Sequence, residues 1–443
     1  MTQKEAFDIL KLGYNVYLTG SAGSGKTFLL NKYIEYLEKN GIGIGITAST
    51  GIAATHINGL TIHSWSGIGI KNKLEENDIN NLLLKPYLQQ RFFETQVLVI
   101  DEVSMLQASR LDMVNQICKV FKNNSAPFGG MQVVICGDFF QLPPVNKNGE
   151  DNSFVDKSDA WREMDVKVCY LEGQFRQKDE KFLKLLNEIR ENNVSVDSLR
   201  LLMSRLHKSL GGDIPPVKLY THNADVDAIN NFELSKIKEK QYEFEMASWG
   251  EQTLVDNLKK GCLAPGKLIL KKGAVVMFVK NNFNQGYVNG TLGKITGFDE
   301  EGFPVVKTAS GFKTVAKPAS WKIEENDVLK AEISQVPLRL AWVITVHKSQ
   351  GMSLDLAEIN LSKSFAFGMG YVALSRVRSL SSMKLMGINK MALQMDETVL
   401  ESDQTLKNLS VQAVIELRNL KLDEKLKKQR QFVQDLNKFK HDF

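Results

Sequence analysis

The chain has little cysteine and little histidine, with four and six copies in 443 residues. The cysteines stand far apart and form no Cys-x-x-Cys pair, and the histidines show no spacing typical of metal ligands. This pattern excludes a disulfide framework and a structural zinc site, and it suits a reducing cytoplasm. The four cysteines are Cys118, Cys136, Cys169 and Cys262.

Long hydrophobic runs and targeting segments are also missing. No apolar run approaches the length of a membrane span, and the N-terminus lacks the charged, apolar and cleavage regions of a signal peptide. A long N-terminal extension is absent too, so nothing supports import into an organelle. We therefore expect a cytoplasmic protein that has no membrane partner.

Strong charge of either sign is absent, because the net charge is +5 and the isoelectric point is about 8.7. Such a mild excess permits nucleic-acid binding without arguing for it. Apolar residues make up 43% and charged residues 24% of the chain, as in soluble globular proteins. The length predicts about three domains, each with its own core.

What the chain does contain is a phosphate-binding motif of the form G-x-x-x-x-G-K-[ST]. Its glycines let backbone N–H groups face the phosphates, its lysine reaches the terminal phosphates, and its hydroxyl holds magnesium. A short apolar strand, 16–18, precedes the motif, and apolar residues at helical spacing follow over 30–37. This context predicts a nucleotide site rather than a chance glycine-rich turn. The motif consists of Gly20, Ser21, Ala22, Gly23, Ser24, Gly25, Lys26 and Thr27.

An apolar strand over 96–100 ends in two adjacent carboxylates, Asp101 and Glu102. After a phosphate loop on the same predicted sheet, such a pair divides two tasks. Asp101 holds magnesium through water, and Glu102 takes a proton from the attacking water. The next buried strand, 132–138, continues into a proline-stiffened loop that places Gln141 to sense a γ-phosphate. Together these residues predict hydrolysis of a nucleoside triphosphate.

Two further sets of polar residues follow predicted strand ends. Thr50 and Gly51 come after the strand 42–48, and the loop 345–351 carries hydroxyl, imidazole, ammonium and amide groups. Both positions suit contact with a nucleic-acid backbone or a nucleotide. From the residues alone, an ordinary strand–helix turn with His63 in the core is favoured for the first set. A solvated hydrophilic loop is the alternative for the second set.

The strand–helix alternation starts again at about residue 168, without a second phosphate loop. A second lobe without its own phosphate loop usually contributes side chains to the nucleotide that the first lobe binds, across the cleft between the two lobes. Arg176 and Arg376 lie on it and are candidates for reaching the γ-phosphate, although most arginines are surface cations. Gln3 opens a short helix before the phosphate loop, where it either contacts adenine or is solvated.

The predicted secondary structure changes in character at two further points of the chain. Between 237 and 335, short strands with turn signals predict a small β-barrel inserted into the second lobe. There Lys280, Phe283 and Tyr287 offer a base-stacking platform, although aromatics in small barrels more often belong to the core. After residue 393 the chain becomes a charged helical tail, which we expect to pack on the second lobe and to fray at its end. A DNA or partner contact is the alternative for the tail.

With these segments in hand, the chain resembles the Pif-one (petite integration frequency) family of DNA helicases, in the 5′ to 3′ branch of helicase superfamily one. The resemblance covers roughly residues 3–388. Its most specific matches are Gly137-Asp138-Phe139-Phe140-Gln141-Leu142-Pro143-Pro144-Val145 and His347-Lys348-Ser349-Gln350-Gly351. One departure concerns the helix before residue 127, which carries Gln116, Lys119 and Lys122 where the family typically has arginines. The resemblance therefore assigns this helix no special role.

The resemblance implies a fold of two RecA-like parallel-sheet lobes, 1–167 and 168–236 with 336–392. It implies that the insertion, 237–335, is a Src-homology-three-like barrel followed later by the helical tail, 393–443. The polar excursion at 66–93 resembles a wedge at the DNA fork.

The resemblance also implies ATP and magnesium as ligands, with Thr27 and Asp101 at the metal. It implies catalytic roles for Lys26, Glu102, Gln141, Arg176 and Arg376. It implies nucleotide contacts by Gln3, Gly20, Ser21, Ala22, Gly23, Ser24, Gly25, Lys26, Thr27, Asp101, Glu102, Gln141, Arg176, Gly351 and Arg376. It implies DNA contacts by Thr50, Gly51, His63, His347, Lys348 and Ser349.

The implied activity is ATP-dependent 5′ to 3′ unwinding of DNA, by translocation on single-stranded DNA. Forks, R-loops and folded G-rich strands are substrates associated with the family, and its processes are DNA repair, recombination, replication and telomere maintenance. Two other functions fit the same residues. One is a RecD-type translocase subunit of a larger complex, and the other is a P-loop ATPase used as a switch without directional movement.

Overall fold

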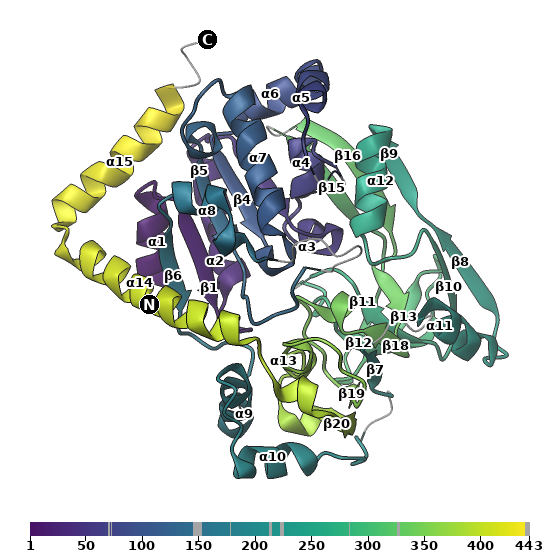
Figure 1. The fold of residues 1–443 in the computed structure, drawn as a ribbon. Helices are drawn as coiled ribbons and strands as arrows, with labels where there is room; N and C mark the ends of the chain where they lie inside the picture. Colours follow the sequence, from purple (N-terminus) through teal and green to yellow (C-terminus); the bar gives the residue numbers. More distant parts are fainter. Residues whose placement is uncertain are drawn as a thin grey trace.

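The computed structural model describes residues 1–69, 71, 73–144, 153–177, 179–211, 215–221, 226–282, 284–325 and 328–438. Two α/β lobes, a largely β segment and a long helical arm make up the molecule (Figure 1). Within the described part of the chain, no helix is both long enough and apolar enough to cross a membrane.

The first lobe is built on a parallel sheet of six strands in the order β3-β2-β4-β5-β1-β6. Its central strands are buried on both faces and therefore read as continuous apolar runs. The strands are β1 Val16–Gly20, β2 Ile44–Ala48, β3 Leu60–Thr61, β4 Val97–Asp101, β5 Gln132–Cys136 and β6 Lys167–Leu171. The helices are α1 Gln3–Lys11, α2 Lys26–Lys39, α3 Gly51–His56, α4 Ile62–Ser66, α5 Glu76–Leu83, α6 Pro86–Glu94, α7 Ala108–Phe121 and α8 Asp159–Glu163.

The expected boundary of the first lobe at residue 167 is wrong by one strand. β6 pairs in parallel with β1, from Val16 opposite Lys167 to Gly20 opposite Leu171, so it is the edge strand of the first sheet. A buried apolar strand has no feature in its own sequence that says which of two sheets it joins.

The excursion at 66–93 contains α5 and α6, and Phe92 packs edge-on against Trp65 with ring centroids 4.8 Å apart. Its role as a wedge stays a prediction.

The second lobe is a parallel sheet of four strands in the order β18-β7-β19-β20. The strands are β7 Val217–Tyr220, β18 Val343–Thr345, β19 Ala357–Leu361 and β20 Met383–Ile388. The helices are α9 Glu180–Arg190, α10 Val196–Met203, α11 Val226–Ser235 and α13 Met369–Leu374. The two parallel sheets confirm the predicted two-lobed α/β class.

The inserted segment forms three small sheets and one helix, α12 Gln252–Gly261. The two-stranded sheet pairs β8 Gln241–Glu245 with β10 Lys267–Lys271, and the three-stranded sheet holds β9 Ala247–Gly250, β15 Ala319–Glu325 and β16 Val328–Gln335. The five-stranded sheet holds β11 Val275–Phe278, β12 Leu292–Phe298, β13 Pro304–Thr308, β14 Lys313–Val315 and β17 Leu338–Leu340. Because β17 pairs with β11, the expected end of the insertion at residue 335 is wrong by one strand. Strand pairing within the described ranges keeps the three sheets separate, so the Src-homology-three-like barrel stays a prediction.

The C-terminal arm consists of α14 Glu397–Asn419 and α15 Leu422–Lys438, and it runs along the first lobe beside α1 and β6 (Figure 1). The expectation that the tail packs on the second lobe is therefore wrong. Ala413 and Leu417 join the core that contains Ile9 and Leu10 of α1. The amphipathic pattern predicted a packed helix correctly, but such a pattern does not identify the surface that receives the apolar face.

Candidate nucleotide site and strand-binding channel

The phosphate loop joins β1 to α2 and depends on glycines at two positions. Gly23 has φ +91° and Gly25 has φ +85°, a left-handed backbone that favours glycine. A Cβ at Gly23 would also lie 2.2 Å from Oε1 of Gln174. Lys26 donates to the carbonyls of Gly20 and Ser21, at 2.9 and 3.1 Å. The ammonium is thus held inside the loop, where loops of this kind bind terminal phosphates.

The two carboxylates follow β4 as predicted. Burial raises the pKa of Asp101, and burial together with the neighbouring charge of Asp101 raises the pKa of Glu102 to about 7. Glu102 has φ +50°, which is uncommon for a residue with a side chain and is frequent at functional sites. Gln350 from the second lobe donates to Oε2 of Glu102 at 3.4 Å. A carboxyl group with a pKa near 7 suits a general base.

Gln141 lies in a turn after β5, and its N–H donates to the carbonyl of Asp138 at 2.9 Å. Its side-chain oxygen is buried and has no hydrogen-bond partner among the described residues. The same holds for the hydroxyl of Ser24 in the phosphate loop and for the side-chain oxygen of Gln350. Because buried polar atoms are nearly always paired, three such atoms around one loop fit a polar ligand.

Arg176 and Arg376 lie near the phosphate loop and the Gln141 turn, and both bond to Ser375 of the second lobe. Arg376 is 1% exposed and donates to the carbonyl of Val372 and the hydroxyl of Ser375, both at 2.8 Å. Burial, together with the charge of Arg176, lowers the pKa of Arg376 to about 9. Burial also lowers the pKa of Arg176, which donates to the carbonyl of Ser375 at 3.2 Å. Arg376 is buried and Arg176 is half-buried, and because both donate to Ser375, their two positive charges favour binding of an anion between them.

One cavity of about 1180 Å³ brings these groups together. Its lining contains Lys26, Glu102, Gln141, Arg176 and Arg376. All five predicted catalytic residues therefore face one space between the lobes. Thr27 and Asp101, the residues predicted for magnesium, line the same cavity.

Gln3 lies at the start of α1, where its amide approaches the carbonyl of Gly25 at 3.5 Å. The helix does not fray there, because Thr2 and Glu5 form a capping box. Two aromatic side chains that the sequence analysis did not assign, Phe28 and Phe175, are 66% and 65% exposed and line the cavity. Exposed rings beside a phosphate loop offer faces on which a nucleobase can stack. An aromatic residue directly before Arg176 was the signal that could have found Phe175.

The predicted strand-binding residues divide into two groups. Thr50, His347 and Lys348 line the cavity, as does Gly351, which was predicted to contact the nucleotide. Gly51, His63 and Ser349 are not part of its lining. Ser349 is fully buried, and its hydroxyl donates to the carbonyl of Val346 at 2.7 Å. Gly51 instead packs against α12, so closely that a Cβ on Gly261 would lie 2.5 Å from the Gly51 carbonyl oxygen.

The cavity continues past Lys348 to residues that lie on the inserted segment. Lys280 sits over the ring of Trp321 at 5.1 Å, and Asn289 contacts the ring of His56 at 2.8 Å. Burial lowers the pKa of His56 to about 4, which keeps the ring neutral. None of these residues except Lys280 was predicted, because their sequence neighbourhoods carry no motif.

The predicted stacking platform does not form as expected. Tyr287 is buried and stacks on Phe278 with centroids 3.8 Å apart, so it belongs to the core of the insertion. Phe283 lies outside the described residues. The ammonium group of Lys280 instead lies over the ring of Trp321, as a cation–π contact.

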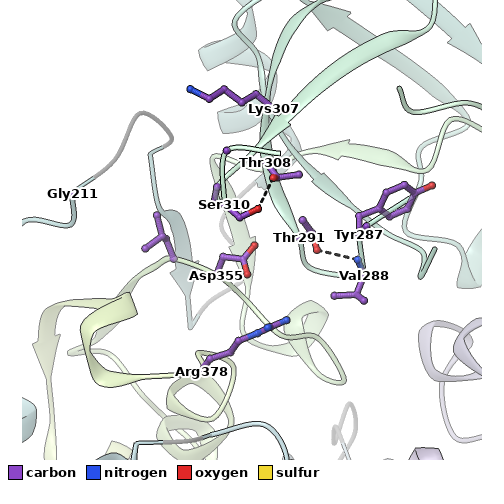
Figure 2. A pocket seen from close by; sticks show the side chains of 13 residues that line it. Gly211, Tyr287, Val288, Thr291, Lys307, Thr308, Ser310, Asp355 and Arg378 are labelled. Atoms are coloured by element: carbon purple, nitrogen blue, oxygen red, sulfur yellow. Dashed lines mark hydrogen bonds between the residues drawn. The ribbon is translucent and has the colours of Figure 1, made fainter. Parts of the chain in front are cut away.

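A second hollow of about 870 Å³ lies between the insertion and the second lobe (Figure 2). Lys307, Thr308, Asp355 and Arg378 line it, and the hydroxyls of Thr308 and Ser310 bond to each other at 2.9 Å. Burial raises the pKa of Asp355. None of the predicted catalytic, nucleotide-binding or DNA-binding residues faces this hollow.

Two parallel-sheet lobes with one phosphate loop at their junction define a two-lobed P-loop ATPase. Comparison with known proteins gives the family. A family model described as PIF1-like helicase matches residues 1–199, and one described as the 2B domain of the DNA helicase Pif1 matches residues 253–298. The chain belongs to the PIF1-like helicase family.

Individual relatives agree with this assignment. The ATP-dependent DNA helicase Pif1 of a Psychrobacter species is 43% identical over 93% of this chain and 72% of its own length. The human ATP-dependent DNA helicase PIF1 is 37% identical over 89% of this chain and 62% of its own length. Among solved structures, unliganded Pif1 from a Bacteroides species has a TM-score of 0.78 and 30% identity, covering 91% of this chain and 96% of that one.

Proposed function

We propose that this chain is an ATP-dependent DNA helicase that moves 5′ to 3′ along single-stranded DNA and opens duplexes ahead of it. The single observation that carries the proposal is the composite cavity. The first lobe contributes Lys26, Glu102 and Gln141, and the second lobe contributes Arg176 and Arg376. Because neither lobe holds a complete hydrolytic site, hydrolysis requires the lobes to come together, and that requirement couples chemistry to movement.

In the proposed reaction ATP is the substrate and each residue has one task. The loop amides and Lys26 hold the phosphates, Glu102 accepts a proton from the attacking water, and Gln141 contacts the γ-phosphate. Arg176 and Arg376 neutralise the charge that develops on the transferred group. The hydroxyl of Thr27 and, through water, Asp101 would hold magnesium, which neutralises charge on the phosphates.

Solved relatives support ATP and single-stranded DNA as ligands. Bacteroides Pif1 has been solved with ADP-AlF4 and with both ADP-AlF3 and single-stranded DNA, and two Pif1 molecules have been solved on forked duplex DNA. The present arrangement is closer to the unliganded relative, with a TM-score of 0.78, than to the DNA-bound ones, at 0.60 to 0.63. We propose that single-stranded DNA passes through the part of the cavity that is lined by Thr50, His347 and Lys348.

A cytoplasmic location is part of the proposal. The four cysteines are free thiols, and three of them are buried in the cores. Burial raises the pKa of Cys118, Cys136 and Cys169, so these thiols stay protonated and unreactive. Such cysteines suit a reducing compartment.

Unwinding of partial duplexes with a 5′ or a 3′ single-stranded tail tests the proposal. The purified chain should unwind the 5′-tailed duplex with ATP and leave the 3′-tailed duplex intact. Strong unwinding only after addition of partner proteins would favour a RecD-type translocase subunit. An ATPase rate that single-stranded DNA does not change would favour a non-motor ATPase switch.

A further inference from the structure

The hydroxyl of Tyr371 reaches from the second lobe to the phosphate loop. Tyr371 lies on α13, is 1% exposed, and accepts a hydrogen bond from the backbone N–H of Ala22 at 2.9 Å. Ala22 is the third residue of the phosphate motif, and Tyr371 stands five residues before Arg376. One helix of the second lobe therefore touches the loop that holds phosphates and leads directly to the arginine that completes the site.

Arg190 joins the same tyrosine to the turn that carries Gln141. Arg190 ends α9 and donates to both carboxylate oxygens of Asp138, at 2.9 and 2.7 Å, and to the hydroxyl of Tyr371 at 3.1 Å. Its guanidinium group also lies over the ring of Phe140, 4.0 Å from the centroid. Arg190 and Asp138 are both buried, at 6% and 1% exposure. Asp138 and Gln141 share one turn.

Neither Tyr371 nor Arg190 has a task in the hydrolysis step derived above. Both nevertheless bridge the lobes at the two places where the first lobe meets the phosphates, namely the loop at Ala22 and the turn at Asp138. Nη1 of Arg190 makes both contacts to the buried carboxylate of Asp138, and displacement of either partner would leave an unpaired buried charge. Movement of the Gln141 turn therefore displaces Arg190, and movement of the loop displaces Tyr371.

We propose that Tyr371 and Arg190 are positioning residues that transmit the state of the phosphate loop and of the Gln141 turn to the second lobe, so that hydrolysis advances the DNA. This inference rests on the proposed helicase function and deepens it. It differs from a purely structural role in what it predicts. A structural role lowers stability and the fraction of active enzyme, whereas transmission sets how many nucleotides are advanced per ATP hydrolysed.

Tyr371→Phe is the direct test, because it keeps the ring and removes only the hydroxyl. We expect the affinity for a fluorescent ADP analogue to stay within about 2-fold of wild type. We expect the number of nucleotides translocated per ATP to fall by about 3- to 10-fold, as loss of one buried hydrogen bond at the coupling step predicts. That ratio does not depend on the fraction of active molecules.

Tyr33→Phe is the matched control. The hydroxyl of Tyr33 is also buried and donates to Oε1 of Gln132 at 2.7 Å, but it lies wholly inside the first lobe. The control should lose comparable stability and keep the wild-type ratio of nucleotides per ATP. Arg190→Lys tests the link from the other side, and its effect on the ratio should not add to that of Tyr371→Phe, because both break one connection.

An unchanged ratio in Tyr371→Phe would overturn the inference, as would an equal loss in Tyr33→Phe. If Tyr371→Phe fails to fold, Asp138→Asn replaces it as the test. An unchanged number of nucleotides translocated per ATP in Asp138→Asn would also reject the inference. Failure of the proposed function looks different. In that case the wild-type protein itself would show no ATPase stimulation by single-stranded DNA.

Discussion

Two guanidinium groups, those of Arg176 and Arg376, face one cavity that is also lined by Glu102, whose pKa is raised to about 7. At neutral pH this part of the pocket therefore carries more positive than negative charge. A triphosphate supplies the missing negative charge, which explains why two arginines are tolerated at such depth. The residue arrangement favours a polyanionic substrate before any step of hydrolysis begins.

Lys26→Ala and Glu102→Gln should fail in different ways. Lys26→Ala removes the ammonium that we propose binds the phosphates, so both nucleotide binding and turnover should be lost. Glu102→Gln keeps the shape and removes the proton acceptor, so ATP binding should remain within a few-fold while the turnover rate falls by about 10²- to 10⁴-fold. Equilibrium binding of a fluorescent nucleotide and steady-state ATPase rates measure the two effects. Normal turnover by Glu102→Gln would reject its assignment as the base.

At this scale the sequence predicted which residues meet at the cavity, because each residue predicted to be catalytic lies in a motif or at a strand end whose geometry is fixed by the parallel sheet. Fewer of the residues predicted to bind DNA line that cavity, and both sets of roles stay predictions. Ser349 belongs to a matched motif, yet its hydroxyl is bonded to the backbone of Val346. His56 and Asn289 face the cavity from two different parts of the fold, and only the folded chain brings them together.

Among the elements, the C-terminal arm is the one that ties the start of the chain to its end. Arg418 pairs with Glu5 at 2.7 Å and Lys425 pairs with Asp8 at 3.0 Å, so both helices of the arm contact α1. The backbone N–H of Thr2, together with Arg418, lowers the pKa of Glu5 to about 2. Because α1 begins at Gln3, beside the phosphate loop, the arm supports the residue that was predicted to contact adenine.

Gly13→Ala should loosen the end of this arm. A Cβ at Gly13 would lie 2.4 Å from the ring of Phe432 on α15, and the backbone there has φ +84°. We expect a loss of about 2–4 kcal/mol in the free energy of unfolding, the sum of a steric clash and a left-handed backbone. Urea denaturation measures the loss, and limited proteolysis should cut α15 first.

Gly41→Ala separates the two contributions. Gly41 has a similar φ of +69°, but a Cβ there would meet no atom within 4 Å. Only the backbone term remains, so the loss should be about 1–2 kcal/mol, with α15 still protected. Equal losses in the two variants would show that Phe432 does not pack against Gly13 in solution.

Element types were largely predictable, and element positions were less so. The sequence placed the start of the second lobe at about residue 168 and predicted a helical tail, but β6 and the tail both attach to the first lobe rather than to the second. The reason is physical: periodicity reports that one face is buried and says nothing about which surface buries it. The three sheets of the insertion show the same limit, because the strand pattern predicted strands without predicting their partners.

Over the whole molecule, the central feature is the proposed catalytic site, which is divided between two lobes that are far apart in sequence. Lys26 and Arg376 are separated by 350 positions and line the same cavity, which extends to Trp321 on the insertion. Nucleotide and DNA candidates thus share one continuous space. A change in the orientation of the two lobes would therefore alter the contacts to the nucleotide and to the DNA at the same time.

Single-turnover ATP hydrolysis by Arg376→Ala on single-stranded DNA tests this divided site most directly. The divided site predicts nucleotide binding within about 10-fold of wild type and hydrolysis slower by about 10³-fold or more. Arg200→Ala, which removes an exposed arginine on α10 of the same lobe, should hydrolyse ATP at the wild-type rate. Hydrolysis by Arg376→Ala within about 2-fold of wild type, with binding intact, would contradict the composite site.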